Sequence, residues 1–359
     1  MIDPHVHLRD EEWAYKETIA NGLWIAEHAR MSAVFDMPNL PRPVTTEERV
    51  LERFALASAA NSPVVYATYV GVTSEPEQLK RAVDVTRKYK FKEGDRTFVS
   101  GLKMFAGRSV GDLSVVEEDE QHLVYETLAR EGYDGVITVH CEKESLIKKG
   151  PDGKQYFDPK NPITHCTARP PEAELESIRD QLLFSEQAGY KGHLHIAHVS
   201  LADSAWLVKN AKKAGRRVSC EVTPHHCLLL SQDMNRPDGI LDKVNPPLRS
   251  YPNPKTLLLY LYLGMIDCVA TDHAPHSRKD KTEPPYLSGF PGLPFYPHFL
   301  KYLRKNNYEM NFDKKQIIEI THTNIENIFG IHLPVSNKPL HYDLRTGYEV
   351  DVYKDFRTS

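Results

Sequence analysis

The chain has 359 residues and a formal net charge of −4, with 40% hydrophobic and 26% charged residues. This balance excludes an intrinsically disordered chain, and the negative charge argues against nucleic acid or an anionic membrane as a partner. The apolar runs are too short to span a bilayer. Five cysteines without a C-x-x-C pair indicate reduced thiols. Because the N-terminus starts directly with a predicted strand, we expect no signal peptide and a cytoplasmic protein.

Short apolar runs alternate with amphipathic segments, a pattern typical of a parallel α/β architecture. Apolar residues at helical spacing predict helices around residues 19–26, 175–182, 201–214 and 316–329. Eight strands are expected, at residues 2–7, 33–37, 64–71, 99–105, 135–140, 193–198, 217–222 and 267–271. Eight strands with intervening helices predict a single (β/α)8 barrel of the TIM type, and we assign it to residues 1–330.

Residues 331–359 form a predicted C-terminal extension, polar until Tyr348–Tyr353. That last stretch is expected either as a short edge strand or as an extension docked on the barrel. Two polar segments, 106–118 and 275–294, follow predicted strands that carry reactive side chains. Loops in such places often cover active sites, but a plain surface connection is an equal alternative for both.

Metal-binding side chains collect where the predicted strands end, which is where the active site of a (β/α)8 barrel lies. His5 and His7 are two residues apart on a strand, so both imidazoles point to one side and can reach one metal ion. Taken singly, each candidate has an ordinary structural explanation, such as a core histidine or a helix cap. Their joint placement at one end of the barrel predicts a two-metal site, with the ligands His5, His7, Lys103, His140, His198 and Asp272.

Lys103 fits such a site in only one chemical form. A protonated ammonium group would be strongly repelled by two dications a few ångströms away. A neutral amine that has captured carbon dioxide becomes a carbamate, whose two oxygens can each hold one metal. Lys103 therefore either is carboxylated or lies outside the site.

With these side chains in this order, the chain resembles the dihydroorotases of the amidohydrolase superfamily. It is most similar to the form found as a domain of the animal multifunctional pyrimidine enzyme and to its bacterial relatives. The matching segments are DPHVHLRD (3–10), KETI (16–19), FDMPN (35–39), GLKMF (101–105), VHCE (139–142), RPPEAE (169–174), IAHVS (196–200), EVTPHH (221–226), VNPPLR (244–249), IDCVATDHAPHS (266–277) and SGFPGLP (288–294). The resemblance implies a metal-dependent hydrolase barrel and the reversible cyclisation of N-carbamoyl-L-aspartate to L-dihydroorotate in pyrimidine (UMP) biosynthesis.

The resemblance also implies two zinc ions and a role for each ligand. The implied ligands are His5, His7 and Asp272 for one ion, His140 and His198 for the other, and carboxylated Lys103 with a hydroxide as the two bridges. Some bacterial members lack the carboxylated lysine, and Lys103 within GLKMF resembles those that use it. Asp272 is the implied general acid/base, moving a proton between the attacking oxygen and the ring nitrogen.

Substrate choice depends on a carboxylate that dihydroorotate has and that dihydropyrimidines and hydantoins lack. Binding a carboxylate calls for cationic or donor groups, ideally an arginine fork. Arg9 lies two residues past His7 on the same strand face. The resemblance assigns the carboxylate to Arg9, Asn39 and His276; a loop histidine that stabilises the turn is the alternative for His276.

Further substrate contacts are implied at three places. Asn245 in VNPPLR occupies a position where some relatives have Arg. Backbone groups near Gly289 and Phe290 are expected to face the pyrimidine edge. Ser109 falls where relatives place a Thr or Ser on a mobile loop, and a solvent-facing serine is the alternative there.

The chain departs from the family in two ways. Many relatives carry a small β-sandwich made from segments on both sides of the barrel. Since Met1 stands only two residues before Asp3, we expect the N-terminal half of that sandwich to be absent. Glu11-Glu12-Trp13 also stands where many relatives have Pro-Gly, beside Arg9.

Two other functions are open alternatives. One is a different cyclic amidohydrolase, such as a dihydropyrimidinase, hydantoinase or allantoinase. The other is a non-catalytic homologue that acts as a scaffold for a transcarbamoylase. Arg9 argues against the first and the full ligand set against the second. We expect a homodimer that acts on a small molecule and has no nucleic-acid or membrane partner; association with a transcarbamoylase in addition to catalysis is left open.

Overall fold

Eight strands form one sheet in sequence order in the computed structural model, which describes residues 1–108, 113–305, 310–335, 341–342, 346–353 and 356. Every neighbouring pair is parallel, as between β1 and β2 and between β7 and β8. The strands are β1 Ile2–Val6, β2 Ala33–Asp36, β3 Val65–Gly71, β4 Thr97–Ala106, β5 Val136–Cys141, β6 His193–Ile196, β7 Val218–Val222 and β8 Cys268–Val269. The predicted (β/α)8 barrel is confirmed, and all strands named in the described residues belong to it.

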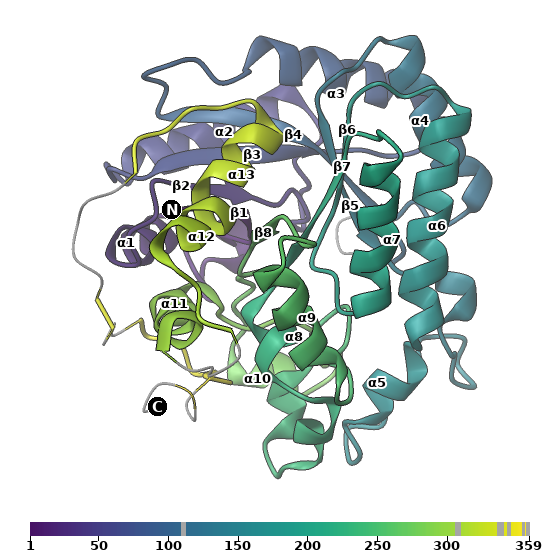
Figure 1. Ribbon diagram of the computed structural model, residues 1–359, viewed down its shortest axis with the longest axis vertical. Helices are drawn as coiled ribbons and strands as arrows, with labels where there is room; N and C mark the ends of the chain where they lie inside the picture. Colours follow the sequence, from purple (N-terminus) through teal and green to yellow (C-terminus); the bar gives the residue numbers. More distant parts are fainter. Residues whose placement is uncertain (109–112, 306–309, 336–340, 343–345, 354–355, 357–359) are drawn as a thin grey trace.

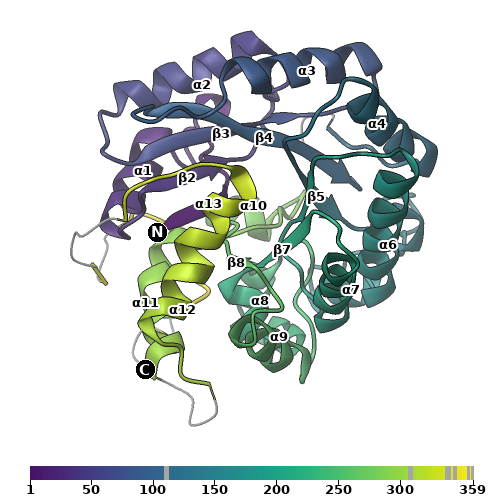
Figure 2. The ribbon, with the colours of Figure 1, turned by 45° about the horizontal axis from the view of Figure 1, so that its top comes forward.

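The helices lie outside the sheet, and Figure 2 shows them as an outer ring around the strands. They are α1 Ile19–His28, α2 Glu47–Ala59, α3 Pro76–Lys88, α4 Glu118–Arg130, α5 Thr164–Ala168, α6 Pro171–Gln187, α7 Ala202–Lys213, α8 Pro224–Leu228, α9 Asn253–Tyr262, α10 Arg278–Thr282, α11 Tyr296–Lys305, α12 Lys314–Ile318 and α13 Asn324–Phe329. Short helical turns lie at Glu11–Trp13, Glu144–Leu146, Ser231–Asn235, Gly239–Asp242, Leu293–Phe295 and, as a π-helix, Glu319–Thr323. Among the described helices, none combines the length and apolar character that crossing a bilayer requires.

The barrel is closed between β8 and β1 by a short contact just beyond both strands. Val6 forms a parallel bridge with His273, and the His7 amide donates to the His273 carbonyl oxygen at 2.7 Å. This seam brings the end of β1 next to the turn after β8. The first and last predicted metal-binding segments are thereby neighbours, although more than half of the chain separates them.

β6 and β8 each end two residues before their predicted ends, because the backbone leaves the β region before the reactive side chain. β6 ends at Ile196, and His198 has a φ of 32°. β8 ends at Val269, and Asp272 has a φ of 48°. A non-glycine residue with such a φ cannot continue a β ladder. The reactive residues therefore sit in turns immediately past the strands rather than within them.

The opposite end of the barrel is filled with aromatic side chains. Phe329 of α13 lies against Phe35 of β2, with ring centroids 5.0 Å apart, and Phe35 also contacts Tyr69 and Phe98. α13 lies beside the N-terminus and β1 in both ribbon views (Figure 1, Figure 2). Burying an aromatic side chain of this size stabilises a fold by about 1.5–3 kcal/mol. This plug leaves the carboxyl ends of the strands as the open end of the barrel.

The C-terminal segment 346–353 contains no strand, so the expected edge strand is not formed. Val350, Val352 and Tyr353 are nevertheless buried. The Tyr353 ring stacks on Phe295, just before α11, with centroids 4.0 Å apart. Side-chain packing, rather than a β ladder, holds this segment against the barrel. The domain boundary assigned at residue 330 remains a prediction.

His193, a partly buried residue at the start of β6, allows a test of how the free energy of unfolding depends on pH. Burial, with further contributions from His195 and Arg217, lowers its pKa from 6.5 to about 3. The unfolded chain binds a proton below pH 6.5 that the folded chain excludes, so this side chain destabilises the fold as the pH falls toward 3. Relative to wild type, His193→Gln should therefore gain about 1.4 kcal/mol of unfolding free energy per pH unit below about pH 6. Urea unfolding of both proteins at several pH values measures this; parallel curves would contradict it.

Candidate metal centre and active site

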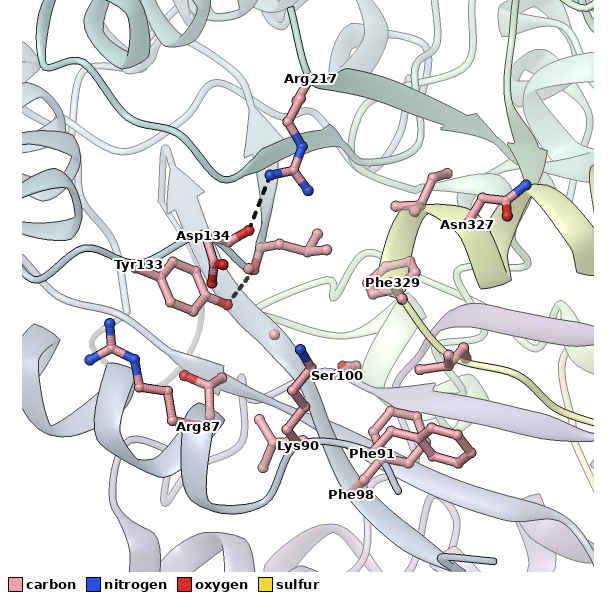
Figure 3. Close-up of a pocket in the computed structure, with 18 residues that line it drawn as sticks. Arg87, Lys90, Phe91, Phe98, Ser100, Tyr133, Asp134, Arg217, Asn327 and Phe329 are labelled. Atoms are coloured by element: carbon pink, nitrogen blue, oxygen red, sulfur yellow. Dashed lines mark hydrogen bonds between the residues drawn. The ribbon is translucent and has the colours of Figure 1, made fainter. Parts of the chain in front are cut away.

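The barrel has a cavity at each end, and they differ in chemistry. At the amino ends of the strands, a cavity of about 220 Å³ is lined by Phe91, Phe98 and Phe329, with Arg87, Lys90 and Arg217 at its edge (Figure 3). None of the residues predicted to bind metal or substrate lines it. It is therefore not the site that the sequence predicts.

The second cavity, of about 290 Å³, lies at the carboxyl ends of the strands. It brings together most of the predicted site residues: His5, His7, Arg9, Asn39, His140, His198, Asn245, Asp272 and His276. Trp13, Arg108 and Lys243, which the sequence reasoning did not assign, line it as well. Residues that lie up to 271 positions apart in the chain thus share one concave surface, as expected for an active site.

One group of ligands forms at the seam between β1 and β8. Nitrogens of His5 and His7 and an oxygen of Asp272 all lie within 4.8 Å of one another. Both imidazoles point their Nε2 at the same carboxylate oxygen, Asp272 Oδ1, at 3.3 Å and 3.0 Å. Two imidazoles and a carboxylate are a usual donor set for zinc.

The second group combines His140 of β5 with His198, which lies two residues past the end of β6. His140 Nδ1 and His198 Nε2 face each other at 3.0 Å. The rings of His5 and His198 have centroids 5.1 Å apart, so the two groups are adjacent. All four imidazoles are buried. Two nitrogens that both point inward at hydrogen-bond distance are arranged as a pair of ligands would be.

Lys103 lies on β4, which is paired with β5 through Lys103 and Thr138. Its side chain is fully buried, and its Nζ has no hydrogen-bond partner among the described residues. Burial lowers the pKa of this amine to about 8. Leaving a buried amine unpaired is costly, whereas a neutral amine is the form that captures carbon dioxide. The surroundings of Lys103 therefore fit the bridging carbamate.

Glu221 of β7 supports the first ligand group by bonding the His5 nitrogen that faces away from Asp272, a role that the sequence did not predict. It bonds to His5 Nδ1 at 2.5 Å and to His195 Nε2 at 3.1 Å, and it accepts the backbone amide of His198 at 3.2 Å. Burial opposes ionisation of this carboxyl, but the two imidazoles outweigh it and hold the pKa of Glu221 well below its usual range. An ionised Glu221 fixes the proton of His5 on Nδ1 and leaves Nε2 free for a metal.

Glu142 does the same for the second group. Its carboxylate lies 3.0 Å from His140 Nε2, and Arg169 donates to it from Nε at 2.9 Å and Nη2 at 2.6 Å. Burial again opposes ionisation, and Arg169 and His140 again outweigh it, so the pKa of Glu142 is well below its usual range. The His140 proton is thereby held on Nε2, and Nδ1 is left facing His198. Glu142 lies in the motif VHCE and Arg169 in the motif RPPEAE, but only the contact between the two side chains indicates this role.

A cationic cluster lies at the rim beside the ligands. Arg9 Nη2 and Lys16 Nζ each lie 3.1 Å from a nitrogen of His276, at Nε2 and Nδ1 respectively. Trp13 lies beneath both cations, at 5.4 Å from the Arg9 guanidinium carbon and 4.2 Å from Lys16 Nζ. Arg9 is buried, which lowers its pKa to about 10, and in the described part of the chain no carboxylate forms an ion pair with it. A buried guanidinium without a counterion favours binding of an anionic ligand.

The remaining predicted substrate residues differ in placement. Asn39 and Asn245 both line the cavity, and the buried Oδ1 of Asn245 has no hydrogen-bond partner in the described residues. Phe290 does not line the cavity: its ring lies 5.0 Å from that of His225, and its carbonyl accepts the Ala274 amide. Ser109 lies outside the described residues.

The fold is shared with solved hydantoinases. L-hydantoinase from Arthrobacter aurescens superposes with a TM-score of 0.75 at 24% identity, covering 92% of this chain and 70% of that one. D-hydantoinase from a Thermus species gives a TM-score of 0.73 at 21% identity, over 94% and 73% of the two chains. At this level of identity the likeness supports the barrel fold alone.

Sequence comparison goes further. No family model matches the chain. Dihydroorotase of Staphylococcus aureus is 34% identical over 313 residues, which are 84% of this chain and 67% of that protein. Dihydroorotase of Staphylococcus epidermidis is 32% identical over 354 residues, which are 96% of this chain and 76% of that protein. The chain belongs to the dihydroorotase family, whose members are hydrolases of cyclic amides.

Proposed function

We propose that this protein is a zinc-dependent dihydroorotase, which interconverts N-carbamoyl-L-aspartate and L-dihydroorotate in pyrimidine biosynthesis. One observation carries the choice of substrate: a buried guanidinium, Arg9, without an ion-pair partner in the described residues, at the rim of a cavity lined by metal ligands. Dihydroorotate supplies the carboxylate that this arrangement lacks. Hydantoins and dihydropyrimidines without that carboxylate leave Arg9 unpaired.

The donor sets support two divalent ions, and we propose zinc for both. His5, His7 and Asp272 would hold one ion, and His140 and His198 the other, with carboxylated Lys103 between them. Ions so placed supply Lewis-acid polarisation of the amide carbonyl and a lowered pKa for water. The protein itself contributes the fixed orientation of each imidazole, which Glu221 and Glu142 set through the nitrogens that face away.

Asp272 is the group that moves the proton. Its carboxyl is buried, and burial raises its pKa above the usual range for an aspartate. During ring opening we propose that Asp272 takes a proton from the attacking oxygen and delivers it to the leaving ring nitrogen, and during ring closure that it removes the amide proton. Arg9, Asn39 and His276 hold the substrate carboxylate in place meanwhile.

A steady-state comparison of dihydroorotate, dihydrouracil, hydantoin and allantoin tests the proposal. We expect hydrolysis of dihydroorotate with a kcat/KM far above that of the other three. Faster turnover of hydantoin or dihydrouracil would replace the proposal with a hydantoinase or dihydropyrimidinase. No turnover of any substrate by protein that holds both metals would favour the non-catalytic scaffold. The homodimer and the association with a transcarbamoylase remain predictions.

The pH dependence checks the proton balance of the proposed reaction. Ring closure converts a dianion, N-carbamoyl aspartate, and one proton into a monoanion, dihydroorotate, and water. Lower pH therefore favours closure, and the ratio of kcat/KM for closure to that for opening should rise about tenfold for each pH unit lost. Assays in both directions at three pH values measure this ratio. A ratio independent of pH would mean that another reaction is being observed.

A further inference from the structure

The C-terminal segment reaches the catalytic end of the barrel and contacts it through two tyrosines. Tyr353 is fully buried, and its hydroxyl lies 3.2 Å from His225 Nδ1. Its ring stacks on Phe295 and touches Phe290, whose centroid is 5.8 Å away. Tyr353 thus seats the segment on the wall behind the active-site cavity. The second tyrosine, Tyr348, is half-buried and contacts His273 beside the seam between β1 and β8.

Tyr348 joins a buried hydrogen-bonded group formed with Glu17 and His273. Its hydroxyl donates to Glu17 Oε1 and lies 3.2 Å from His273 Nε2. His273 Nε2 in turn lies 3.1 Å from both carboxylate oxygens of Glu17. Glu17 and His273 are both buried. Burial, together with the neighbouring Glu17, raises the pKa of Tyr348 well above its usual range, so the hydroxyl stays protonated and donates.

His273 connects this group to the metal ligands through the backbone. It directly follows Asp272, and its carbonyl oxygen accepts the His7 amide at 2.7 Å. The His273 Nδ1 accepts the Leu293 amide at 3.2 Å, which leaves Nε2 to donate to Glu17. His273 is thus held on both sides of its ring and through its main chain. Its position fixes the seam at which Asp272 and His7 meet.

Asp272 needs such support because its backbone is strained. A φ of 48° places an aspartate in the left-handed region. Such residues are energetically unfavourable and persist where the surrounding structure over-determines them. The turn after β8 is short and lies past the end of the ladder. The contacts of His273 on one side of Asp272, and those of Thr271 with Asp3 on the other, therefore hold the Asp272 carboxylate toward His5 and His7.

We propose that Tyr348 is a positioning residue for the metal-ligand seam, acting through Glu17 and His273 on Asp272 and His7. The role in catalysis rests on the proposed function, whereas the role in ligand geometry does not. Tyr348 touches neither the ligands nor the cavity. Its contribution is to keep the Glu17–His273 pair in the orientation that the strained turn requires.

Tyr348→Phe removes the hydroxyl and leaves the ring, and Tyr89→Phe is a matched control. Tyr89 also donates its hydroxyl to a glutamate, Glu47, at 2.6 Å, but on α2 and α3 at the outside of the barrel. Loss of a partner behind the ligands typically costs about 10–100-fold in activity or metal affinity. We expect Tyr348→Phe to lower kcat for dihydroorotate by about tenfold, with little change in KM, and Tyr89→Phe to change neither. Equal kcat values for the two variants would overturn the proposal.

Zinc release gives a readout that does not depend on the reaction. We expect Tyr348→Phe, loaded with zinc, to lose metal to a chelator about tenfold faster than wild type or Tyr89→Phe. Glu17→Gln should show the same effect, and the double variant Glu17→Gln/Tyr348→Phe should add little to it, because both act through one link. Unchanged release rates with a lowered melting temperature would mean that Tyr348 serves only to dock the segment. If wild type instead fails to turn over dihydroorotate, the proposed function fails while the release experiment still decides the role of Tyr348.

Discussion

Lys103→Ala should lose metal and activity together. We expect wild-type protein to contain about two zinc ions per chain and this variant to contain fewer, because the proposed bridge takes both of its oxygens from carboxylated Lys103. Loss of the two-metal arrangement removes on the order of 4 kcal/mol of transition-state stabilisation, or about a thousandfold in kcat. Metal analysis of the dialysed proteins, together with steady-state rates, measures both quantities.

Two further arms make this experiment specific for the carbamate. Lys143→Ala is the control, because Lys143 pairs with Glu118 and Asp180 away from the cavity and its loss should leave metal and activity unchanged. A small carboxylate such as acetate should restore part of the zinc content and rate of Lys103→Ala, because it offers two oxygens in the space that the side chain vacates. Full activity and two zinc ions in Lys103→Ala without added carboxylate would show that the bridge is not needed.

Arg9→Met should change which substrates the protein accepts. Methionine keeps much of the length and apolar contact of arginine, and removes the charge-assisted hydrogen bonds. Two hydrogen bonds to a charged group are together worth about 3 kcal/mol, or about a hundredfold in kcat/KM for dihydroorotate and carbamoyl aspartate. Dihydrouracil, which has no carboxylate to lose, should be affected much less. Steady-state kinetics on the three substrates gives the comparison.

Arg108→Met is the matched control for Arg9→Met. Arg108 also lines the cavity, but its Nε already donates to Glu144 at 3.0 Å. We expect this variant to retain the preference for carboxylated substrates. If Arg9→Met weakened dihydrouracil as strongly as dihydroorotate, Arg9 would act on the metal ligands or on stability, and the substrate assignment would be wrong.

The candidate metal ligands could be identified from the sequence because each is tied to a local pattern. His5 and His7 alternate on a strand, and Lys103 lies in a buried apolar strand, where an unpaired lysine calls for an explanation. Parallel strands in a barrel bring their carboxyl ends to one place, so predicting the strands also predicts the meeting of the side chains. The (β/α)8 fold, which the structure confirms, could be predicted for the same reason, because hydrophobic periodicity is a local property of the sequence.

The supporting residues could not be predicted in this way. Glu221 could be read as a polar residue on a strand, and only its side-chain contacts with His5 of β1 and His195 of β6 show that it holds both imidazoles. The exact ends of β6 and β8 likewise depend on the positive φ values of His198 and Asp272, which no sequence period indicates. Turn geometry at an active site follows from the surrounding contacts rather than from the turn itself.

What the sequence by itself determined is therefore the barrel, the family and the set of residues that reach the carboxyl ends of its strands. The tertiary structure decided which nitrogen of each imidazole faces inward, that Arg9 is buried with no counterion among the described residues, and that Tyr348 contacts Glu17, 331 positions away. The physical reason is that hydrophobic periodicity depends only on the order of residues along the chain. Buried hydrogen bonds between distant segments depend on atomic distances that exist only after the barrel has closed at its last seam.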